Sequence, residues 1–343
     1  MKYQLRMYYA DAVNESAGPK ATRDCSAILS EMGYQHFDVP IYSNSHPLRN
    51  LCMLLQRFGH LFLSLLTRDR VLLQYPLLGV NRWLQYFARL VRSRHCQLIC
   101  LVHDLDALRQ LHHDWSLSEE VARLNAFELV IVHNENMKEL LQAHGLKADT
   151  RCLGLFDYLL PGQNLPDPQL QNAVGTAYSR IAFAGNLGKS AFLSKLDQVE
   201  DLRFVLYGPG FDTLQASTNL EWAGSFDADV LPAKLQADFG LVWDGESIDA
   251  CTGFLGQYLK YNNPHKASLY LLAGLPIIAP RSSAIGDFIR THGIGITVDA
   301  LTDLPVILGR MQHADYQSMK AAIGPVALKI ASGVFLKQAL ANT

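Results

Sequence analysis

The sequence predicts an α/β protein made of two doubly wound parallel sheets. Its 343 residues are too many for one ordinary domain and suit two. Short apolar runs alternate with stretches of helical periodicity along both halves, as in chains that form parallel sheets covered by helices. Pro161–Gly175 is rich in Pro, Gly, Asn and Gln, which is typical of a linker. Two such domains would face a central cleft, with ligands expected where the strands end.

The predicted domains are residues 1–160, a linker over 161–178, residues 179–325, and a C-terminal helix over 326–343 that could pack back on the first domain. In the first domain, the strands are expected at Tyr3–Tyr9, His36–Val39, Val71–Tyr75, Gln97–Val102 and Leu129–Val132. The helices between them are expected at Pro19–Met32, Leu48–Leu66, Asn81–Arg94, Ser118–Asn125 and Asn134–His144. Arg151–Tyr158 continues the alternation and leads out of this domain.

The second domain repeats the alternation of strands and helices. Its strands are expected at Ile181–Ala184, Arg203–Tyr207, Leu220–Ala223, Phe239–Trp243, Pro276–Ala279 and Gly295–Val298. Its helices are expected near Val230–Gln236, Pro264–Ala273, Ser283–Thr291, Leu304–Met311 and Tyr316–Ile330.

Composition narrows the class of protein. The chain is 49% hydrophobic, 18% charged and carries a net charge of -2, which argues against bulk nucleic-acid binding. Its six cysteines are scattered and predict reduced thiols in a cytosolic protein. The N-terminus enters a strand directly, without a signal-peptide pattern. Leu51–Leu66 is interrupted by polar residues, so no membrane-spanning run is expected.

The stretch that carries the most information is the start of the helix expected after Asn263. Asn263 suits an N-cap and Pro264 the first helical position. A helix N-terminus favours acids, yet this one carries His265 and Lys266. Free backbone N–H groups beside a lysine suit a phosphate. The alternative interpretation is a solvated lysine near a helix start.

Acids close the strand that precedes this helix. Asp244, Gly245 and Glu246 follow the apolar run Phe239–Trp243, and a Tyr-rich loop with Tyr258 comes next. Carboxylates there could hold sugar hydroxyls. Side by side with an anion-binding helix start, they suggest a nucleotide-sugar pocket.

Two glycine turns follow the first two strands of the second domain. The segment from Gly185 to Ser190 reads GNLGKS, which lacks the spacing of a P-loop but exposes Asn186 and Lys189 to an anion. The other turn contains Tyr207 and Gly208. Tyr207 could stack on a base, or it could simply pack the end of its strand.

Two loops of the first domain are further candidates. Asp11, Gly18 and Lys20 precede or open a helix and could contact the acceptor or a diphosphate, although a surface loop explains them equally well. His103 and Asp104 end the fourth strand, where either could act as general base; a helix cap with a packed histidine is the alternative. The spacing of Asp104 and Asp106 does not supply a third ligand, so no metal site is expected.

The first domain also carries a charge bias. From Val39 to His103 the only acid is Asp69, whereas the span holds eight arginines and no lysine. Trp83 and Phe87 interleave with arginines along one predicted helix, which could lie on anionic lipid. An ordinary helix with a solvated basic face is the alternative.

Four segments resemble a known family, most strongly over residues 180–290. They read FAGNLGKSAFL, GSFDADVLPAKL, FGLVWDGESIDACTGFLGQYLKYNNPHKASLYLLAGLPII and LVHDLDALR. Together they resemble the bacterial β-1,6-galactofuranosyltransferase-like family of surface-polysaccharide synthesis. They resemble more distantly the glucosyltransferase that extends O-glycans on serine-rich adhesins.

The resemblance implies a GT-B fold with two Rossmann-like domains, a UDP-sugar donor in the C-terminal domain and a saccharide acceptor in the N-terminal one. It implies no metal and no cofactor beyond the UDP-sugar co-substrate. Nucleotide contacts would fall at Lys189, Tyr207 and Lys266. The expected reaction is inverting transfer of a hexosyl unit, galactofuranosyl favoured, to a lipid-linked O-antigen or capsule saccharide at the cytoplasmic membrane face.

Three alternatives stay open: a UDP-glucose-dependent glucosyltransferase, a non-catalytic nucleotide-binding partner subunit, and a GT-B epimerase. Nothing in the sequence decides whether the chain forms a homo-oligomer.

Overall fold

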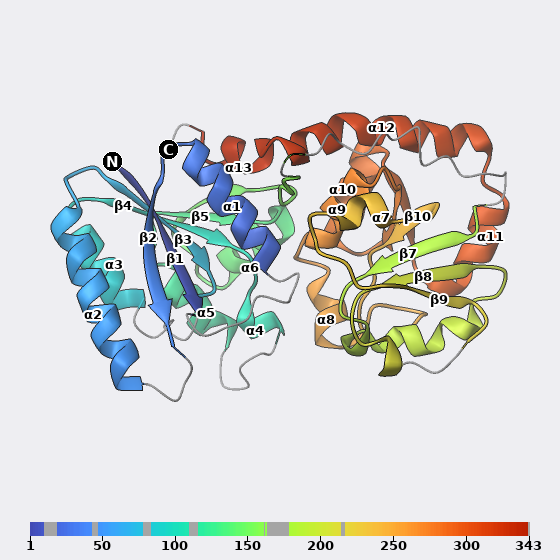
Figure 1. The fold of residues 1–343 in the computed structure, drawn as a ribbon, viewed down its shortest axis with the longest axis horizontal. Coiled ribbons are helices and arrows are strands. Elements are labelled where there is room, and N and C mark those ends of the chain that lie inside the picture. The colour runs from blue at the N-terminus through green and yellow to red at the C-terminus, as the bar shows by residue number, and fades with distance from the viewer. Residues whose placement is uncertain are drawn as a thin grey trace. The chain divides into compact units, whose positions relative to one another are not determined.

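The computed structural model describes residues 1–9, 19–42, 47–77, 84–109, 116–160, 162, 178–213 and 217–341. The chain forms two compact units, each described by itself (Figure 1). Unit 1 comprises Met1–Leu153 with Leu336–Thr343, and unit 2 comprises Gly154–Phe335. Within the described residues each unit is built on a parallel six-stranded sheet, which confirms the predicted α/β class.

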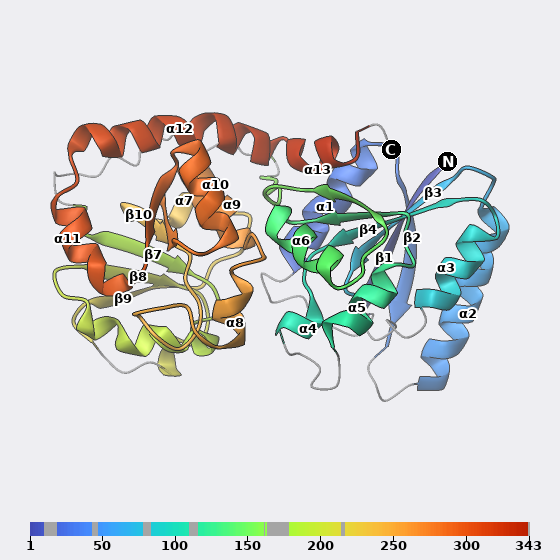
Figure 2. The ribbon, with the colours of Figure 1, turned by 180° about the vertical axis from the view of Figure 1, so that it is seen from behind.

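The sheet of unit 1 has the strand order β2-β1-β3-β4-β5-β6. Its strands are β1 (Lys2–Tyr9), β2 (Gln35–Ile41), β3 (Arg70–Tyr75), β4 (Gln97–Val102), β5 (Leu129–Val132) and β6 (Asp149–Cys152). Its helices are α1 (Pro19–Glu31), α2 (Pro47–Ser64), α3 (Leu84–Arg92), α4 (Asp106–Arg109), α5 (Leu117–Leu124), α6 (Glu135–Ala143) and the end of α13 (Val334–Ala339). Helix α1 lies in front of the sheet in Figure 1, and α6 lies in front of it in Figure 2, so helices cover both faces.

Unit 2 has the strand order β12-β11-β10-β7-β8-β9. Its strands are β7 (Arg180–Ala184), β8 (Arg203–Tyr207), β9 (Leu220–Gly224), β10 (Phe239–Leu241), β11 (Ile277–Pro280) and β12 (Gly295–Val298). Its α-helices are α7 (Leu231–Lys234), α8 (Gly253–Tyr258), α9 (His265–Leu272), α10 (Ala284–His292), α11 (Leu304–Gly309) and α12 (His313–Ala331). The strand order reverses between β7 and β10, and this switch point is where doubly wound sheets bind ligands.

Short 3₁₀ helices connect β7 to β8, where the sequence predicts a glycine turn and no helix. Leu187–Lys189 and Ala191–Gln198 form them, and Phe211–Thr213 and Leu301–Asp303 are 3₁₀ helices elsewhere in unit 2. The sequence also gave no indication of α8, because its six residues include two glycines and offer too little helical periodicity.

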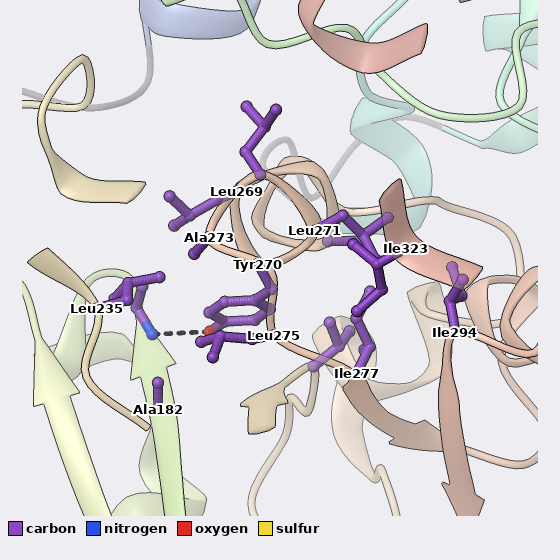
Figure 3. Close-up of a cluster of buried hydrophobic side chains, with 14 of the residues drawn as sticks. Ala182, Leu235, Leu269, Tyr270, Leu271, Ala273, Leu275, Ile277, Ile294 and Ile323 are labelled. Carbon is purple, nitrogen blue, oxygen red and sulfur yellow. Dashed lines mark hydrogen bonds between the residues drawn. The ribbon is translucent and has the colours of Figure 1, made fainter. Parts of the chain in front are cut away.

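One side chain explains why β10 ends at Leu241 rather than at Trp243. The ring of Tyr270, in α9, is fully buried between β7 and β10 (Figure 3). Its hydroxyl accepts a hydrogen bond from the Ala184 N–H at 2.8 Å and donates to the Leu241 carbonyl at 3.1 Å. The two strands pair directly only before this point. Tyr270 therefore takes over the strand-to-strand hydrogen bonds and holds α9 against both strand ends.

Gly240 makes room for that tyrosine. A Cβ atom added at Gly240 would lie 2.2 Å from the Tyr270 ring. Most of α9 is buried around it, with Ala267 to Leu272 all inside the core. Helix α9 is thus a central packing element, and its first turn is presented at the carboxyl edge of the sheet.

All six cysteines are free thiols, and none is paired in a disulfide. Among the described residues, no helix combines the length and the apolar composition needed to cross a bilayer.

Candidate active site

The first turn of α9 begins one residue later than the sequence predicts. The N-cap is Pro264, which offers no side-chain cap, and the first turn contains no acid. Asn263, predicted as the cap, is buried and instead donates its amide to the Gly154 carbonyl. The cap prediction was therefore wrong, because Pro264 itself stays extended, with ψ 140°, and takes the cap position. Proline offers no side-chain acceptor to the backbone N–H groups of the first turn.

Lys266 lies in this turn and points toward β7. Its ammonium nitrogen sits 4.4 Å from the centre of the Phe183 ring, and the side chain is only partly exposed. Burial lowers the pKa of Lys266, while the nearby Asp244 and Cys251 act in the opposite direction. No ion pair or hydrogen bond to its ammonium is found in the described parts of the chain. Lys266 is thus a poorly solvated cation, which an incoming anion would stabilise.

The turn after β10 brings its acids to the same edge. Asp244 accepts the Gly245 N–H at 2.9 Å, and its charge reaches both Lys266 and Cys251. Gly245 has φ +105°, and a Cβ there would lie 2.2 Å from the Thr252 carbonyl oxygen. The backbone of this turn therefore packs directly on the loop before α8. Burial raises the pKa of Cys251 to about 12, so its thiol stays neutral and leaves Asp244 as the nearby anion.

Glu246 is the exposed carboxylate of this turn. Its side chain faces solvent, while its backbone carbonyl accepts the Lys195 ammonium at 2.7 Å. Tyr258, predicted to line the same pocket, is 4% exposed and lies in the core. Its burial corrects that expectation, because α8 turns the ring inward.

The turns after β7 and β8 pack backbone against backbone. The Gly185 N–H donates to the Tyr207 carbonyl at 3.0 Å, and the Leu187 N–H donates to the Pro209 carbonyl at 2.9 Å. Gly208 has φ +134°, and a Cβ there would lie 1.9 Å from the Gly185 carbonyl oxygen. Only glycine fits such an approach.

Two polar side chains extend from the first of these turns. Asn186 and Lys189 are both exposed, as the sequence predicts. The Lys189 N–H closes a 3₁₀ turn on the Asn186 carbonyl at 3.3 Å. The ammonium of Lys189 is therefore carried on a short, glycine-bounded turn next to β7.

Tyr207 is not placed to stack on a base. Its ring is 2% exposed, and its hydroxyl accepts the Gln236 N–H at 2.9 Å. Burial raises the pKa of this tyrosine. The packing interpretation of Tyr207 is the one that the structure favours, because strand alternation turns its ring into the core.

Exposed aromatic rings lie nearby instead. Trp222, on β9, is 49% exposed, donates its indole N–H to the Gly208 carbonyl at 3.0 Å and stacks on Phe211. Phe226 is 38% exposed and its ring centre lies 6.4 Å from that of Tyr207. Sequence reasoning missed both. Trp222 lies on a strand that looks buried until its edge position in the sheet is known, and Phe226 follows that strand.

His265 faces the segment that enters unit 2. Its ring stacks on Tyr158 with centres 4.7 Å apart, and its Nε2 lies 3.4 Å from the Asp157 carbonyl. The Ser268 hydroxyl donates to the Phe156 carbonyl at 2.5 Å. These contacts fix the start of α9, so His265 acts first as an anchor rather than as the free donor ligand that the sequence suggested.

In unit 1, His103 and Asp104 follow β4 as predicted. Asp104 forms an ion pair with Arg109. His103 makes a hydrogen bond between its Nε2 and the Gln74 Oε1 at 2.7 Å. Because an amide oxygen can only accept, His103 carries its proton on Nε2 in this contact. A neutral ring in that tautomer has Nδ1 as its basic atom.

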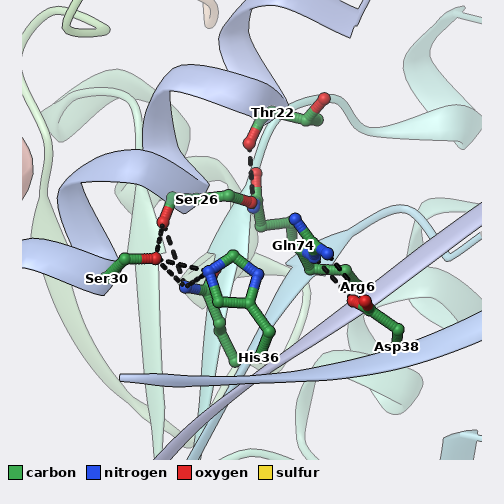
Figure 4. A network of polar contacts seen from close by, with 8 residues as sticks. Arg6, Thr22, Ser26, Ser30, His36, Asp38 and Gln74 are labelled. Carbon is green, nitrogen blue, oxygen red and sulfur yellow. Dashed lines mark hydrogen bonds and ion pairs between the residues drawn. The ribbon is translucent and has the colours of Figure 1, made fainter. Parts of the chain in front are cut away.

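Gln74 is oriented by α1. Its amide nitrogen donates to the Thr22 carbonyl at 3.2 Å and to the Ser26 hydroxyl at 2.9 Å (Figure 4). These contacts turn the amide oxygen toward His103. Arg6 and Asp38 form a bidentate pair in the same network. Polar contacts between the helix and the sheet thus set the histidine tautomer.

Two buried groups that the sequence did not indicate hold the loop after β4. Glu120 is fully buried and accepts the N–H groups of Asp106 and Ala107 at 2.9 Å, along with the Tyr75 hydroxyl at 2.9 Å. Burial raises its pKa. His133 makes a hydrogen bond with the Val102 carbonyl at 3.1 Å, and burial lowers its pKa to about 4. The sequence alone does not show that either side chain is buried, because both look like ordinary solvated polar residues.

Lys20 does not offer a free cation. Its ammonium pairs with Asp24 at 2.7 Å, and both side chains are buried. The acceptor contact predicted for Lys20 is corrected accordingly, since the lysine charge already has a carboxylate partner one turn along α1. Asp11 and Gly18, the other acceptor candidates, lie outside the described residues.

No group of three or more His, Cys, Asp and Glu side chains comes together as a metal site in the portion of the chain that the structure describes. The converging groups are therefore the helix start with Lys266, the acidic turn after β10 and the glycine turn after β7. All three lie at the β7/β10 switch point of unit 2. Such an arrangement can hold a phosphate next to a hydroxyl-rich group.

Both halves of the chain match domains of one known protein family. Residues 2–155 match the N-terminal domain, and residues 181–343 the C-terminal domain, of the glucosyltransferase 3-like family. The β-1,6-galactofuranosyltransferase WbbI of Escherichia coli K12 is 29% identical over 348 residues, covering 97% of each chain. Glucosyltransferase 3 of Streptococcus gordonii is 25% identical, covering 99% of this chain and 97% of its own.

Solved structures show the same fold at low sequence identity. Sucrose-phosphate synthase from Thermosynechococcus elongatus superposes with a TM-score of 0.67 over 100% of both chains, at 14% identity. Anabaena HepE, solved in complex with UDP and glucose, gives a TM-score of 0.59 over 98% of this chain and 99% of its own, at 13% identity. These likenesses confirm the predicted GT-B fold.

Proposed function

This chain belongs to the glucosyltransferase 3-like family, and on that basis we propose that it transfers a galactofuranosyl unit from UDP-galactofuranose to a saccharide acceptor of surface-polysaccharide synthesis. Glycosyltransfer itself is the activity shared by its relatives, and the chain is a glycosyltransferase. The choice of donor sugar follows the relative named for galactofuranose, which aligns over nearly the whole chain.

The observation that carries the proposal is the partly buried Lys266 at an uncapped helix start. The cation is poorly solvated, and the helix start that carries it has neither a side-chain cap nor an acid in its first turn. Charge on the leaving UDP grows as the glycosidic bond breaks. A preorganised cation and helix dipole stabilise that charge most in the transition state. Lys266 is therefore assigned to the leaving diphosphate, with Lys189 as a second cation.

The turns around this lysine suit the remainder of the donor. At Gly185, only the Phe183 ring lies within 4 Å of where a Cβ would stand, so the bare backbone there permits close approach of phosphate and ribose. The exposed rings of Trp222 and Phe226, rather than Tyr207, are assigned to the base. Asp244 and Glu246 are assigned to the hydroxyls of the sugar, because a carboxylate can accept two such hydrogen bonds.

For the acceptor hydroxyl, the contacts favour His103 over Asp104 as general base. The ion pair with Arg109 stabilises Asp104 as a carboxylate and occupies part of it. His103 is oriented by Gln74 with its Nε2 proton engaged. In this assignment Nδ1 takes the proton of the acceptor hydroxyl, while that oxygen attacks the anomeric carbon and UDP leaves from the opposite face. The transfer is proposed to be inverting and to need no metal, since Lys266 and Lys189 supply the positive charge.

The test is a donor screen on the purified chain. UDP-galactofuranose, UDP-galactopyranose, UDP-glucose and UDP-N-acetylglucosamine are each mixed with protein, with and without membrane extract and EDTA, and released UDP is followed. Acceptor-dependent release from UDP-galactofuranose that survives EDTA is the expected result. Release from UDP-glucose alone would keep the pocket but change the donor.

Two further outcomes distinguish the alternatives. UDP binding without release from any donor would make the chain a non-catalytic partner subunit. Turnover of a UDP-sugar without any acceptor would instead indicate an epimerase. The matched control for the pocket is Lys329→Met, which removes an exposed lysine from α12.

A further inference from the structure

Helix α2 exposes an unusual number of leucines. Leu48 is 77% exposed, Leu55 is 65% exposed and Leu63 is 76% exposed. Leu51 at 36% and Leu66, just beyond the helix, at 60% add to them. We call these five residues the leucine face. Among the α2 residues whose burial the structure describes, 48–64, only Leu54 and Leu61 are buried.

The four leucines within α2, Leu48, Leu51, Leu55 and Leu63, share one side of the helix. Steps of three, four and eight residues separate them, and at about 100° per residue all fall within roughly a third of the helix circumference. They extend about 23 Å along the helix, and Leu66 follows its end. Isolated surface leucines are ordinary, but four exposed leucines along one side of a helix indicate contact with something apolar.

The two helices at the leucine face carry charge of one sign, and the acids of neighbouring segments, Asp38 and Glu128, are paired with Arg6 and Arg92. Helices α2 and α3 contain no acidic residue, and the acid that lies between them, Asp69, is buried and paired with the N-terminus. Arg94 lies with its guanidinium 4.6 Å from the Phe62 ring of α2, and Arg89 extends from the exposed side of α3. Arg49 and Arg68 lie near the two ends of the leucine face in sequence and are exposed.

Helix α3 does not present the apolar face that the sequence suggested. Leu84, Phe87, Ala88 and Val91 are buried, and Phe87 packs on Phe58 of α2 with ring centres 4.6 Å apart. Trp83 lies outside the described residues. The apolar residues of α3 thus belong to the core, and the surface strip belongs to α2.

We propose that the leucine face of α2 docks on an anionic lipid bilayer, with the surrounding arginines at the headgroups. Leucines inserted to the level of the acyl chains and arginines above them are the two attractions that hold an amphipathic helix at a membrane surface. A second copy of the chain is a poorer occupant. A two-fold contact through this face would bring arginines together without an acid on α2 or α3 to pair them.

The experiment is vesicle co-sedimentation of the full chain, which needs neither donor nor acceptor and is therefore independent of the proposed reaction. Vesicles of phosphatidylcholine, with and without phosphatidylglycerol, are compared at low and high salt. We expect binding to the anionic vesicles that weakens with salt. The double variant Leu55→Asp/Leu63→Asp should bind at least about tenfold more weakly, and Arg89→Gln about fivefold more weakly.

Leu328→Asp is the matched control, because Leu328 is a similarly exposed leucine, 58% exposed, on α12 of unit 2. It should leave vesicle binding unchanged. Because the substituted leucines are exposed, all variants should keep the wild-type circular dichroism and UDP affinity. Equal binding by the double variant and wild type would overturn the proposal. So would an absence of vesicle binding together with a wild-type dimer that the double variant converts to monomer.

Discussion

Replacing Lys266 with methionine should separate catalysis from stability. Methionine keeps most of the length of the side chain and its contact with the Phe183 ring but removes the charge. If Lys266 stabilises the leaving diphosphate, turnover should fall about 100-fold, equivalent to about 2.7 kcal/mol, which is typical for the loss of one transition-state donor. UDP should also bind more weakly, because the bound nucleotide carries the same diphosphate.

The free energy of unfolding of Lys266→Met should stay close to that of wild type or rise slightly, although turnover falls. Burial lowers the pKa of Lys266 in the folded chain below its pKa in the unfolded chain. At any pH below the unfolded pKa, keeping the charged lysine buried therefore costs folding free energy. Removing the charge relieves this penalty, and the lost cation–π contact with Phe183 is worth only about 0.5–1 kcal/mol. Urea unfolding at neutral pH should therefore give a free energy of unfolding within about 1 kcal/mol of wild type.

The assay pairs UDP release under saturating donor with thermal protection by UDP. Wild type and Lys329→Met should both be protected by UDP, and Lys266→Met much less so. Lys266→Arg should recover part of the turnover, because it restores the charge with a bulkier group. Turnover of Lys266→Met within twofold of wild type, in a folded protein, would refute the assignment of this lysine. A loss of several kcal/mol in stability would refute the idea that its charge is held at a cost.

The remaining predictions concern other residues of both units. His103→Gln should lower turnover, measured by UDP release, by about 100-fold or more while UDP affinity stays intact. Asp104→Asn should lower turnover less. If Asp104→Asn lowered it more than His103→Gln, the base role would return to Asp104. The folded chain should lose up to about 3 kcal/mol as the pH falls from 6.5 to 4, because the buried His133 has its pKa lowered to about 4 and must be protonated on unfolding. Urea titrations of His133→Gln should show a shallower pH dependence over that range. Gly208→Ala should destabilise the chain by more than about 2 kcal/mol, since its Cβ would meet a backbone oxygen at 1.9 Å. Gly324→Ala in α12, with nothing within 4 Å, should instead stabilise it by about 1 kcal/mol in the same unfolding assay.

The sequence could predict features that depend on local pattern. Alternation of strands and helices predicted both parallel sheets, and the structure confirms a helix start without acids at Lys266, while the anion site placed there stays a prediction. Strand ends were found to within a residue or two where an apolar run stops at a glycine, as at Gly185.

Features that depend on a distant partner could not be predicted. The pairing of Lys20 with Asp24, the inward turn of Tyr207 and the use of Asn263 as an anchor all result from which group meets which after folding. The same holds for the exposed Trp222, whose edge strand looks like any buried one in sequence. Local chemistry identified candidate residues, and tertiary contacts decided which of them remain accessible.

The close backbone packing of the turns at the switch point bears on how donor preference could change among related proteins. Side chains at Gly208 and Gly245 would collide with neighbouring backbone, so these two positions are closed to substitution whichever sugar is used. Asn186 and Glu246 are exposed and can be exchanged without disturbing that packing. Diversification of sugar specificity is therefore expected to proceed through a few replaceable side chains on an invariant backbone frame. A library randomised at Asn186 and Glu246 would be the efficient starting point for changing the donor.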